Sequence, residues 1–361
     1  MPQAKLSSRQ DKTMNICDLL NIQLPLIQAP MAGVQGSALA IAVSNAGGLG
    51  SLPCAMLTAD ALRSELDAIQ AGTTKPFNVN FFCHTAPAIC STTEMAWRQT
   101  LMPYYKEFGI DPQTIAAGAE RTPFNDRVAD ILEVFRPSVV SFHFGLPAPE
   151  LLKRVKDFGA KVLSSATTVE EAVWLEIHGA DAIIAQGLEA GGHRGMFLTD
   201  DLTTQVGTFA LLPQIIRRVQ VPVIAAGGIA DARGISAAMA LGASGVQMGT
   251  AYLLAHEATT SSVHREALKS SSATHTALTS LFSGRPARGI VNRVMQELGP
   301  LSVKAPAFPL ASTAIAPLRA KAEAAASGEF SPLWAGQNTS GCVEASAAEI
   351  TKALSQGFKA Y

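Results

Sequence analysis

Short apolar runs alternate along the chain with longer stretches of helical character. The apolar runs, interpreted as strands, cover residues 27–33, 49–52, 77–82, 139–144, 161–165, 182–186, 223–226 and 245–248. Helices are predicted at residues 37–45, 58–70, 149–158, 169–178, 209–219 and 232–241. Strands this apolar are typical of a parallel sheet that is covered on both faces. Eight strand–helix units within about 250 residues predict a (β/α)8 TIM barrel, an α/β fold. The alternative, a doubly wound open sheet, usually has fewer strands and a switch point.

Two segments break the alternation, and both follow the carboxyl end of a predicted strand. Residues 84–121 follow the third strand, and residues 255–335 are helical, rich in Ala and Ser, and punctuated by Pro. Barrel enzymes place their active site at this end of the strands. We therefore expect a barrel over residues 15–254, a smaller, mostly helical substrate-side region made of the two insertions, and a terminal segment, 336–361, whose helix packs back on the barrel. For both insertions, peripheral packing helices are the alternative to substrate lids.

Composition excludes several classes of protein. Residues 19–59 carry no Asp, Glu, Lys, Arg or His, but polar residues and Pro interrupt this run. No purely apolar stretch is therefore long enough to predict a membrane span. Hydrophobic residues make up 48% of the chain and charged residues 16%, which is not the composition of a disordered protein. The net charge of −1 without a basic block excludes nucleic acid as an expected partner.

The N-terminal segment and the cysteines indicate in which cellular compartment the protein is expected. Residues 1–15 are polar and lack the apolar core of a signal peptide. The five cysteines are an odd number without a CxxC pair, so we expect reduced thiols and a cytoplasmic protein. Cys83, His84 and Cys90 lie close together, but no further ligand spacing supports zinc, and no metal is predicted. Monomer and homodimer both remain open.

Glycine and polar residues concentrate where the predicted strands end. The segment QGLEAGGHRG follows the sixth strand, AAGGI ends the seventh, and QMGT ends the eighth. TIM barrels often bind a phosphate with the loops after strands seven and eight, through backbone N–H groups and a helix N-terminus. Glycine lets phosphate oxygens approach these groups. The candidate phosphate ligands are Gly227, Gly228, Gly249 and Thr250.

Seven stretches, taken in order, resemble the nitronate monooxygenase family, formerly called 2-nitropropane dioxygenases. They are QAPMAG (28–33), NAGGLGSL (45–52), FNVNFF (77–82), FHFGLP (142–147), QGLEAGGHRG (186–195), AAGGIADARG (225–234) and QMGTAYL (247–253). The AGGHRG and FHFG elements, together with SGRPARGIVNR (283–293) and WAGQ (334–337), are similar to bacterial class I members. The resemblance implies a TIM barrel that holds FMN tightly and carries an added substrate-side domain.

The resemblance also implies which residues hold the flavin. Along the ring system it places Pro30, Met31, Ala32 and Gly33. It also implies that Asn80 and Gln186 contact the flavin from strands three and six, and that Gly191 and Gly192 lie close to it. For the ribityl phosphate it implies Gly227, Gly228, Gln247, Met248, Gly249 and Thr250. The glycine argument from the residues alone points to the same two loops.

His193 is the leading catalytic candidate, because it lies in a Gly-rich loop where a buried structural histidine is not expected. A neutral imidazole can take the α-proton of a nitroalkane at neutral pH. If the substrate arrives as the nitronate anion, no base is needed, and His193 orients the anion instead. Both roles remain open. His143, in FHFG, is a candidate substrate contact, with a structural role as the alternative.

Two further pairs of residues are candidates for substrate recognition. The resemblance places Tyr104 and Tyr105 near the substrate, although adjacent tyrosines cannot easily both face one pocket. Arg285 and Arg288, in SGRPARG, either attract an anionic substrate or belong to a solvated turn.

The function that the resemblance implies is oxidation of alkyl nitronates, with propionate 3-nitronate as the expected substrate. O2 is the co-substrate, the products are a carbonyl compound and nitrite or nitrate, and the biological role is detoxification. No GxGxxG follows a strand of a βαβ unit, which is consistent with chemistry that needs no nicotinamide. Two alternatives stay open: an NAD(P)H-dependent FMN reductase, such as an enoyl-acyl-carrier-protein or quinone reductase, and a non-catalytic FMN- or phosphate-binding barrel.

Overall fold

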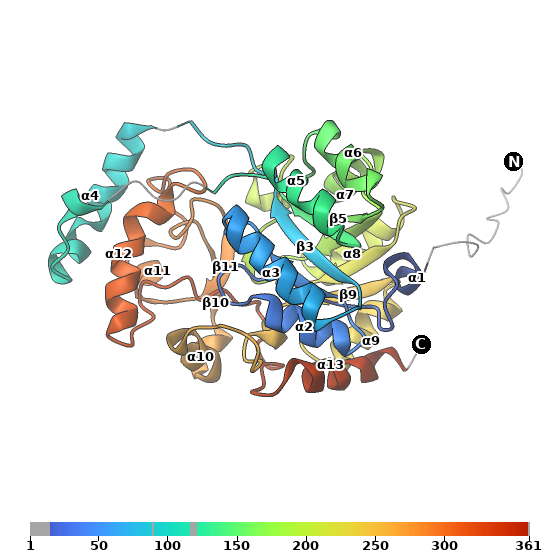
Figure 1. The fold of residues 1–361 in the computed structure, drawn as a ribbon. Helices are drawn as coiled ribbons and strands as arrows, with labels where there is room; N and C mark the ends of the chain where they lie inside the picture. The colour runs from blue at the N-terminus through green and yellow to red at the C-terminus, as the bar shows by residue number, and fades with distance from the viewer. Residues whose placement is uncertain (1–14, 89, 116–120, 360–361) are drawn as a thin grey trace, which may run out of the picture.

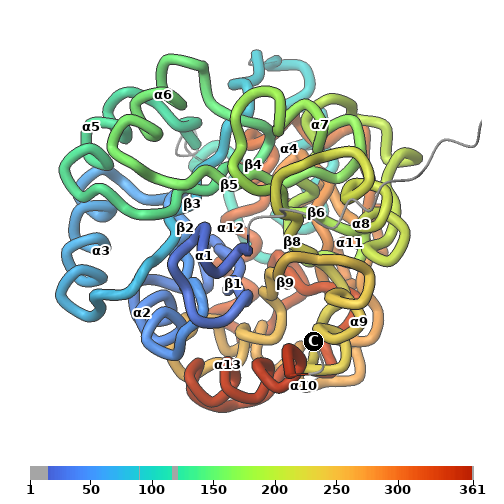
Figure 2. The backbone as a smooth tube through the Cα atoms, turned by 90° about the vertical axis from the view of Figure 1, so that its right-hand side faces the viewer, coloured from blue at the N-terminus to red at the C-terminus, as the bar shows by residue number. Residues whose placement is uncertain are grey.

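A closed barrel of eight parallel strands forms the centre of the computed structural model, which describes residues 15–88, 90–115 and 121–359. The strands are β1 (Leu26–Gln28), β2 (Gly50–Pro53), β3 (Phe77–Phe82), β4 (Val139–His143), β5 (Lys161–Ala166), β6 (Ala182–Gln186), β8 (Val223–Ala226) and β9 (Gly245–Met248). Their order in the sheet is β1-β9-β8-β6-β5-β4-β3-β2, and a parallel bridge between Ile27 and Leu49 joins the two ends. Figure 2 shows the strands around the centre and the helices outside them. The predicted TIM barrel is confirmed.

Seven helices pack around the outside of the barrel. They are α2 (Ser37–Asn45), α3 (Ala59–Gly72), α5 (Asp126–Phe135), α6 (Pro149–Asp157), α7 (Val169–Ile177), α8 (Thr208–Ile216) and α9 (Ala232–Ala240). Two large buried clusters fill the space between these helices and the strands, one around Leu39 and Ile183 and the other around Leu66 and Phe142. Among the helices that the structure describes, none is both long and apolar enough to cross a membrane.

A short helix at the start of the described chain covers the amino end of the barrel. In α1 (Ile16–Leu20), Ile16 and Leu20 belong to one buried cluster with Ile27, Leu163 and Ile224 from inside the barrel. The C-terminal helix α13 (Ala347–Ser355) packs against α2 and α9, as Figure 1 shows. Because α1 covers the amino end of the barrel, a ligand site is expected at the carboxyl ends of the strands.

The first strand is shorter than its apolar pattern predicts. β1 ends at Gln28, and residues 29–33 form a loop. Pro30 has no N–H group for a ladder hydrogen bond, which favours the end of the strand at this point. Two buried amides support the loop from below, because Gln35 Oε1 accepts from Gln28 Nε2 at 2.7 Å and from Met31 N at 3.1 Å.

The two insertions pack together at the end of the molecule remote from α1 (Figure 1). The first insertion contains α4 (Ser91–Glu107), and the second contains α10 (Ser262–Lys269), α11 (Arg293–Leu298) and α12 (Ala311–Ala324). Trp97 and Leu101 of α4 share a buried cluster with Ile315 and Leu318 of α12. The indole Nε1 of Trp97 also donates to the carbonyl oxygen of Ala311 at 3.2 Å. The two insertions therefore form one helical layer, although Trp97 and Ala311 are 214 positions apart in the sequence.

The second insertion, predicted as helical, also contains two strands. β10 (Thr276–Thr279) and β11 (Ala287–Ile290) are antiparallel, and β11 also pairs with β7 (Gly192–His193), a two-residue strand in the loop after β6. Four-residue strands that pair with a distant loop carry too little periodicity to be found from the sequence. This small sheet connects the insertion directly to the loop that carries His193.

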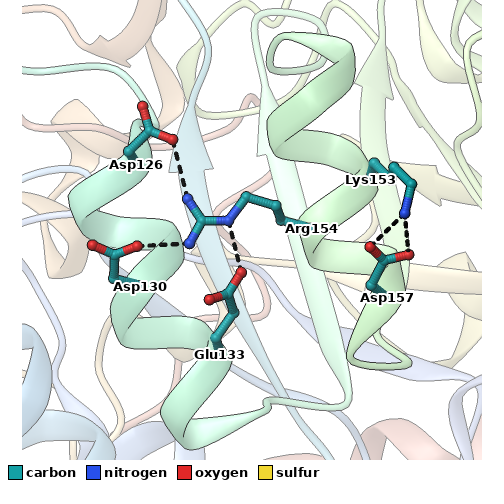
Figure 3. Close-up of polar contacts among 6 residues, drawn as sticks. All are labelled: Asp126, Asp130, Glu133, Lys153, Arg154 and Asp157. Atoms are coloured by element: carbon teal, nitrogen blue, oxygen red, sulfur yellow. Dashed lines mark hydrogen bonds and ion pairs between the residues drawn. The ribbon is translucent and has the colours of Figure 1, made fainter.

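A group of ion pairs joins α5 and α6 on the outer surface. Arg154 of α6 contacts Asp126, Asp130 and Glu133 of α5 at 3.1, 2.6 and 2.7 Å (Figure 3). All three carboxylates are well exposed, so solvent screening keeps the stabilising effect small. The contacts fix the spacing of two helices far from the barrel opening and take no part in the site described next.

Candidate active site

A cavity of about 260 Å³ lies at the carboxyl ends of the barrel strands. Its wall includes His143 and His193 and every residue predicted to bind the cofactor: Pro30, Met31, Ala32, Gly33, Asn80, Gln186, Gly191, Gly192, Gly227, Gly228, Gln247, Met248, Gly249 and Thr250. Both insertions contribute to it, through Arg121 from the first and Arg319 and Trp334 from the second. The fold thus brings residues from nearly the whole length of the chain to one place.

The loops after β8 and β9 form a recess without side chains in this wall. Gly227 and Gly228 have φ angles of 115° and 73°, a conformation that residues with a side chain rarely adopt. A Cβ atom at Gly227 would lie 2.9 Å from Oγ1 of Thr208 and 3.0 Å from the backbone N of Ala190. The chain therefore requires glycine here, and the bare backbone suits the close approach of an anionic group.

An unpartnered polar atom in the same wall indicates a ligand. Oε1 of Gln247 is buried and has no hydrogen-bond partner within the described part of the chain. A buried acceptor is normally satisfied, so a ligand that brings a donor would remove this cost. The flavin ring carries such an N–H donor on a flat, largely apolar body, and the loop of residues 29–33, including Met31, offers an apolar surface beside it. The residues present therefore fit a flavin.

His193 is held in the cavity wall by its backbone. It lies on β7, and its carbonyl oxygen accepts from Nε2 of Gln186 at 2.9 Å and from Nε2 of His143 at 3.1 Å. Because a carbonyl oxygen only accepts, Nε2 of His143 must carry the proton. The side chain of Gln186 also makes a second hydrogen bond, in which its Oε1 accepts from the backbone N of Gly195 at 2.7 Å. His143 and Gln186 therefore position the loop of His193, in addition to lining the cavity.

The imidazole of His193 makes one side-chain hydrogen bond within the described residues. Its Nε2 lies 2.8 Å from Oγ of Ser283, which is itself buried at 3% exposure. Among the described residues, no hydrogen bond to the other ring nitrogen, Nδ1, is found. Nδ1 is therefore the atom left to meet a substrate.

Both histidines of the site are neutral at neutral pH. Burial lowers the pKa of His193 well below its usual value, and the nearby charges of Arg121 and Arg285 lower the same pKa further. Burial likewise lowers the pKa of His143 to about 4. The site therefore combines neutral imidazoles with two guanidinium groups, and an anion is the ligand that this arrangement favours.

Aromatic rings surround His193 on several sides. Ring-centre distances from His193 are 5.3 Å to Phe308, 5.6 Å to Trp334, 6.1 Å to Phe144 and 6.2 Å to Phe82. These rings exclude water and lower the local dielectric, which strengthens electrostatic contacts with a bound ligand.

Tyr104 and Tyr105, predicted near the substrate, are not among the residues that line this cavity. Both belong to α4 and are buried where it packs on the second insertion. The hydroxyl of Tyr104 donates to Oε2 of Glu297 at 2.7 Å, and that of Tyr105 donates to the carbonyl oxygen of Ala314 at 2.6 Å. Their aromatic rings pack into the core of the helical layer. The sequence pattern does not distinguish such core tyrosines from tyrosines that line a binding site.

Arg288 follows neither alternative offered by the sequence, because it is buried and does not line the cavity. Arg285 is partly buried and does not line the cavity either, but its charge acts on His193. Arg288 is 5% exposed and donates to the carbonyl oxygens of Leu188 and Thr276. Arg285 stacks on the ring of Phe144 at 4.1 Å and bonds a backbone carbonyl, so its charge acts on the site from behind the aromatic wall.

Several residues near the site were missed in the sequence. Ser283 lies in the SGRPARG segment, in which the arginines and not the serine suggest a function. Arg121, His264 and Trp334 line the cavity but come from the insertions, where no strand end marks them. Trp334 begins the WAGQ stretch that resembles class I members. For Arg121 and His264 the only signal is their type: a polar residue in a long insertion at the catalytic end of a barrel.

A TIM barrel with a glycine-lined anion recess, an unpartnered amide and a neutral histidine at one cavity defines a cofactor-dependent barrel enzyme. Comparisons with known proteins identify the family. The model of the family described as "Nitronate monooxygenase" matches residues 13–357. A nitronate monooxygenase from Pseudomonas aeruginosa is 44% identical over 93% of this chain and 96% of its own length. One from Paraburkholderia phytofirmans is 41% identical over 94% of each chain. The chain belongs to the nitronate monooxygenase family, and it is a flavin-dependent oxidoreductase.

Two solved structures have the same overall architecture. A nitroalkane oxidase from Streptomyces ansochromogenes aligns with a TM-score of 0.86 and 36% identity, over 96% of this chain and 99% of the other. FabK from Thermotoga maritima aligns with a TM-score of 0.69 and 28% identity, over 96% of each chain. The higher score and identity of the first structure agree with the family assignment.

Proposed function

We propose that this protein is an FMN-dependent nitronate monooxygenase that oxidises alkyl nitronates, propionate 3-nitronate among them, with O2. The products are a carbonyl compound and nitrite or nitrate, and the role is detoxification in the cytoplasm. The observation that carries the proposal is the neutral His193 at the barrel opening, on which the charges of Arg121 and Arg285 act, because this combination favours an anionic substrate. The family match and the similarity to a nitroalkane oxidase support the same chemistry.

The residues that hold FMN follow from the fit of the cavity. Gly227, Gly228 and Gly249 line the cavity and would present bare backbone to the phosphate, and Gln247 Oε1 would accept from the N–H group of the ring. The loop of residues 29–33 would offer apolar contact to the ring. When bound, FMN supplies the redox chemistry by accepting an electron from the substrate, which no side chain of this site does.

The proton on His193 follows from two contacts of Ser283. Its Oγ is 2.8 Å from Nε2 of His193 and 3.3 Å from the carbonyl oxygen of Arg285. Because a carbonyl oxygen only accepts, the serine proton is directed to Arg285, and Nε2 of His193 donates to Oγ. Nδ1 is then unprotonated and able to accept the α-proton of a nitroalkane. With a nitronate anion, the reverse tautomer, in which Nδ1 carries the proton, donates a hydrogen bond to a nitronate oxygen.

His193→Asn tests this role. We expect kcat/KM for propionate 3-nitronate to fall about 100-fold. The loss with the parent nitroalkane will be larger if His193 also acts as a base. The exposed His178→Asn serves as the control. Unchanged turnover in His193→Asn with full flavin content would remove His193 from the reaction.

The activity itself is tested by the absorbance of the purified, FMN-loaded protein mixed anaerobically with propionate 3-nitronate. We expect the flavin absorbance to change within one turnover time, and O2 consumption with nitrite release when air is admitted. An unchanged spectrum contradicts the proposal and leaves the non-catalytic binding barrel.

A nicotinamide-dependent reductase is the second candidate, because FabK has a similar fold. NADH or NADPH added anaerobically separates the two functions. We expect almost no flavin bleaching within the time that nitronate takes to react. Rapid bleaching by either nucleotide would favour the reductase.

A further inference from the structure

We propose that Arg121 binds a carboxylate of the substrate, so that the enzyme prefers nitronates that carry a second negative charge. This inference rests on the proposed nitronate oxidation and assigns a specificity-determining residue within it. Arg121 lies in the long connection between β3 and β4, and it lines the same cavity as His193. The sequence gives no reason to choose it among the 28 Lys and Arg residues of the chain.

Arg121 and His193 contact the same aromatic ring. The guanidinium carbon of Arg121 is 5.6 Å from the centre of the Phe308 ring, and that ring is 5.3 Å from the ring of His193. A nitronate whose oxygen meets His193 can therefore extend a short aliphatic chain along Phe308 toward Arg121. The ring of Phe308 provides apolar contact for the methylene groups between the two charged ends.

No carboxylate neutralises Arg121 within the described part of the chain. Other arginines of the protein do have such partners: Arg319, also in the cavity wall, pairs with Glu323 at 2.8 Å, and Arg293 pairs with Glu107 at 2.7 Å. Arg121 has no Asp or Glu side chain among the described residues within 4.0 Å. Burial and the charge of Arg319 both lower the pKa of Arg121, so its surroundings disfavour the cation when no ligand is bound. A bound carboxylate would offset that cost.

The cofactor phosphate is not the anion that Arg121 meets. The glycine recess belongs to the loops after β8 and β9, whereas Arg121 enters from the connection that follows β3. In the strand order of the barrel, β3 and β8 lie opposite each other, with three strands between them on either side. The cavity thus has two separate places for negative charge, one for a phosphate and one for a substrate carboxylate.

The alternative is that Arg121 only packs on Phe308, since 5.6 Å is within the range of a cation–π contact. If Arg121 only packs, its replacement should change kcat/KM equally for nitronates with and without a carboxylate. If Arg121 binds the substrate carboxylate, its replacement should lower kcat/KM more for the nitronate that carries one, and the experiment measures this difference.

The experiment compares propionate 3-nitronate with propyl-1-nitronate, which has a methyl group in place of the carboxylate. In the wild type, we expect a higher kcat/KM for the acid. In Arg121→Met, kcat/KM for the acid should fall about 10- to 100-fold, mainly through KM, and at least tenfold more than for propyl-1-nitronate. Arg121→Lys should restore part of the preference. The exposed Arg63→Met removes the same charge from outer helix α3 and should leave the preference unchanged.

Equilibrium binding gives a readout that needs no turnover. Glutarate, a dicarboxylate that cannot be oxidised here, is titrated into the FMN-loaded protein, and the flavin absorbance is followed. We expect saturable binding in the wild type and at least tenfold weaker binding in Arg121→Met. Equal losses on both nitronates and equal glutarate affinities in both proteins would overturn the assignment.

The two proposals fail in different ways. Turnover of propyl-1-nitronate without any preference for the acid leaves nitronate oxidation standing and removes the role of Arg121. Absence of turnover with either nitronate contradicts the oxidation, while the glutarate titration still decides whether Arg121 binds a carboxylate.

Discussion

Oγ of Ser283 lies 2.8 Å from Nε2 of His193, although 90 positions separate the two residues in the sequence. The contact exists because β11, which follows Ser283, pairs with β7, which carries His193. An insertion outside the barrel therefore sets the orientation of the ring that faces the cavity. This makes Ser283 a positioning residue for His193.

Ser283→Ala should lower kcat/KM for nitronates about tenfold, because Nε2 of His193 loses its partner and the ring loses its preferred tautomer. Stopped-flow absorbance of the FMN-loaded variant measures the effect. Ser312→Ala is the matched control, since Ser312 is a partly buried serine of α12 whose hydroxyl donates to the carbonyl oxygen of Pro309. A variant that keeps wild-type kinetics at all pH values would show that Ser283 does not act on His193.

Gly227→Ala should lower the affinity for FMN at least tenfold. The added Cβ would meet Oγ1 of Thr208 at 2.9 Å, and the φ angle of 115° adds about 1–2 kcal/mol of strain. Flavin content after gel filtration measures this loss. Gly159→Ala is the control, because Gly159 has a φ of 94° but nothing within 4 Å of its Cβ position and lies outside the cavity. Equal flavin content in the two variants would contradict the assignment of the recess.

His264 should make the folded state sensitive to mild acid. Burial lowers the pKa of this histidine to about 4, whereas an unfolded histidine has a pKa of about 6.5. Between these values the unfolded chain binds more protons, so the free energy of unfolding falls as the pH drops. From pH 7.5 to 5 the loss from one such residue is about 2 kcal/mol.

Urea denaturation of the FMN-loaded protein at both pH values measures this loss. His264→Gln should reduce it by about 2 kcal/mol, whereas the exposed His275→Gln should not change it. The idea fails if both variants keep the pH dependence of the wild type.

Tyr105→Phe should affect stability and not substrate recognition. The hydroxyl of Tyr105 donates to the carbonyl oxygen of Ala314 at 2.6 Å in a fully buried position. Its removal leaves that acceptor unpaired and should lower the free energy of unfolding by about 1–3 kcal/mol. Thermal unfolding measures this effect, and KM for propionate 3-nitronate should stay within twofold. A large change of KM with unchanged stability would return Tyr105 to the substrate site.

The barrel and the glycine loops of its cavity wall could be predicted from local pattern, whereas the other cofactor residues were predicted from the family resemblance. The buried strand runs 77–82 and 182–186 are apolar enough to indicate a parallel sheet, and Gly227 and Gly249 stand directly after strands seven and eight. In a TIM barrel the carboxyl ends of all strands meet on one face, so a residue at a strand end lies near the cavity wherever it is in the chain. For such residues, position in the sequence is nearly equivalent to position in space.

The insertions follow no such rule. Tyr104 and Tyr105 have the composition of a binding wall, yet they pack into a helical layer, whereas Arg121, Ser283 and Phe308, without any local signal, lie around His193. The chain alone determined the eight-strand barrel, the glycine recess and the candidate histidine, because repeating local patterns encode them. Only the tertiary structure decided which insertion residues surround that histidine. Those contacts depend on the pairing of β7 with β11 and on the packing of α4 against α12, and both join segments that are far apart in the sequence.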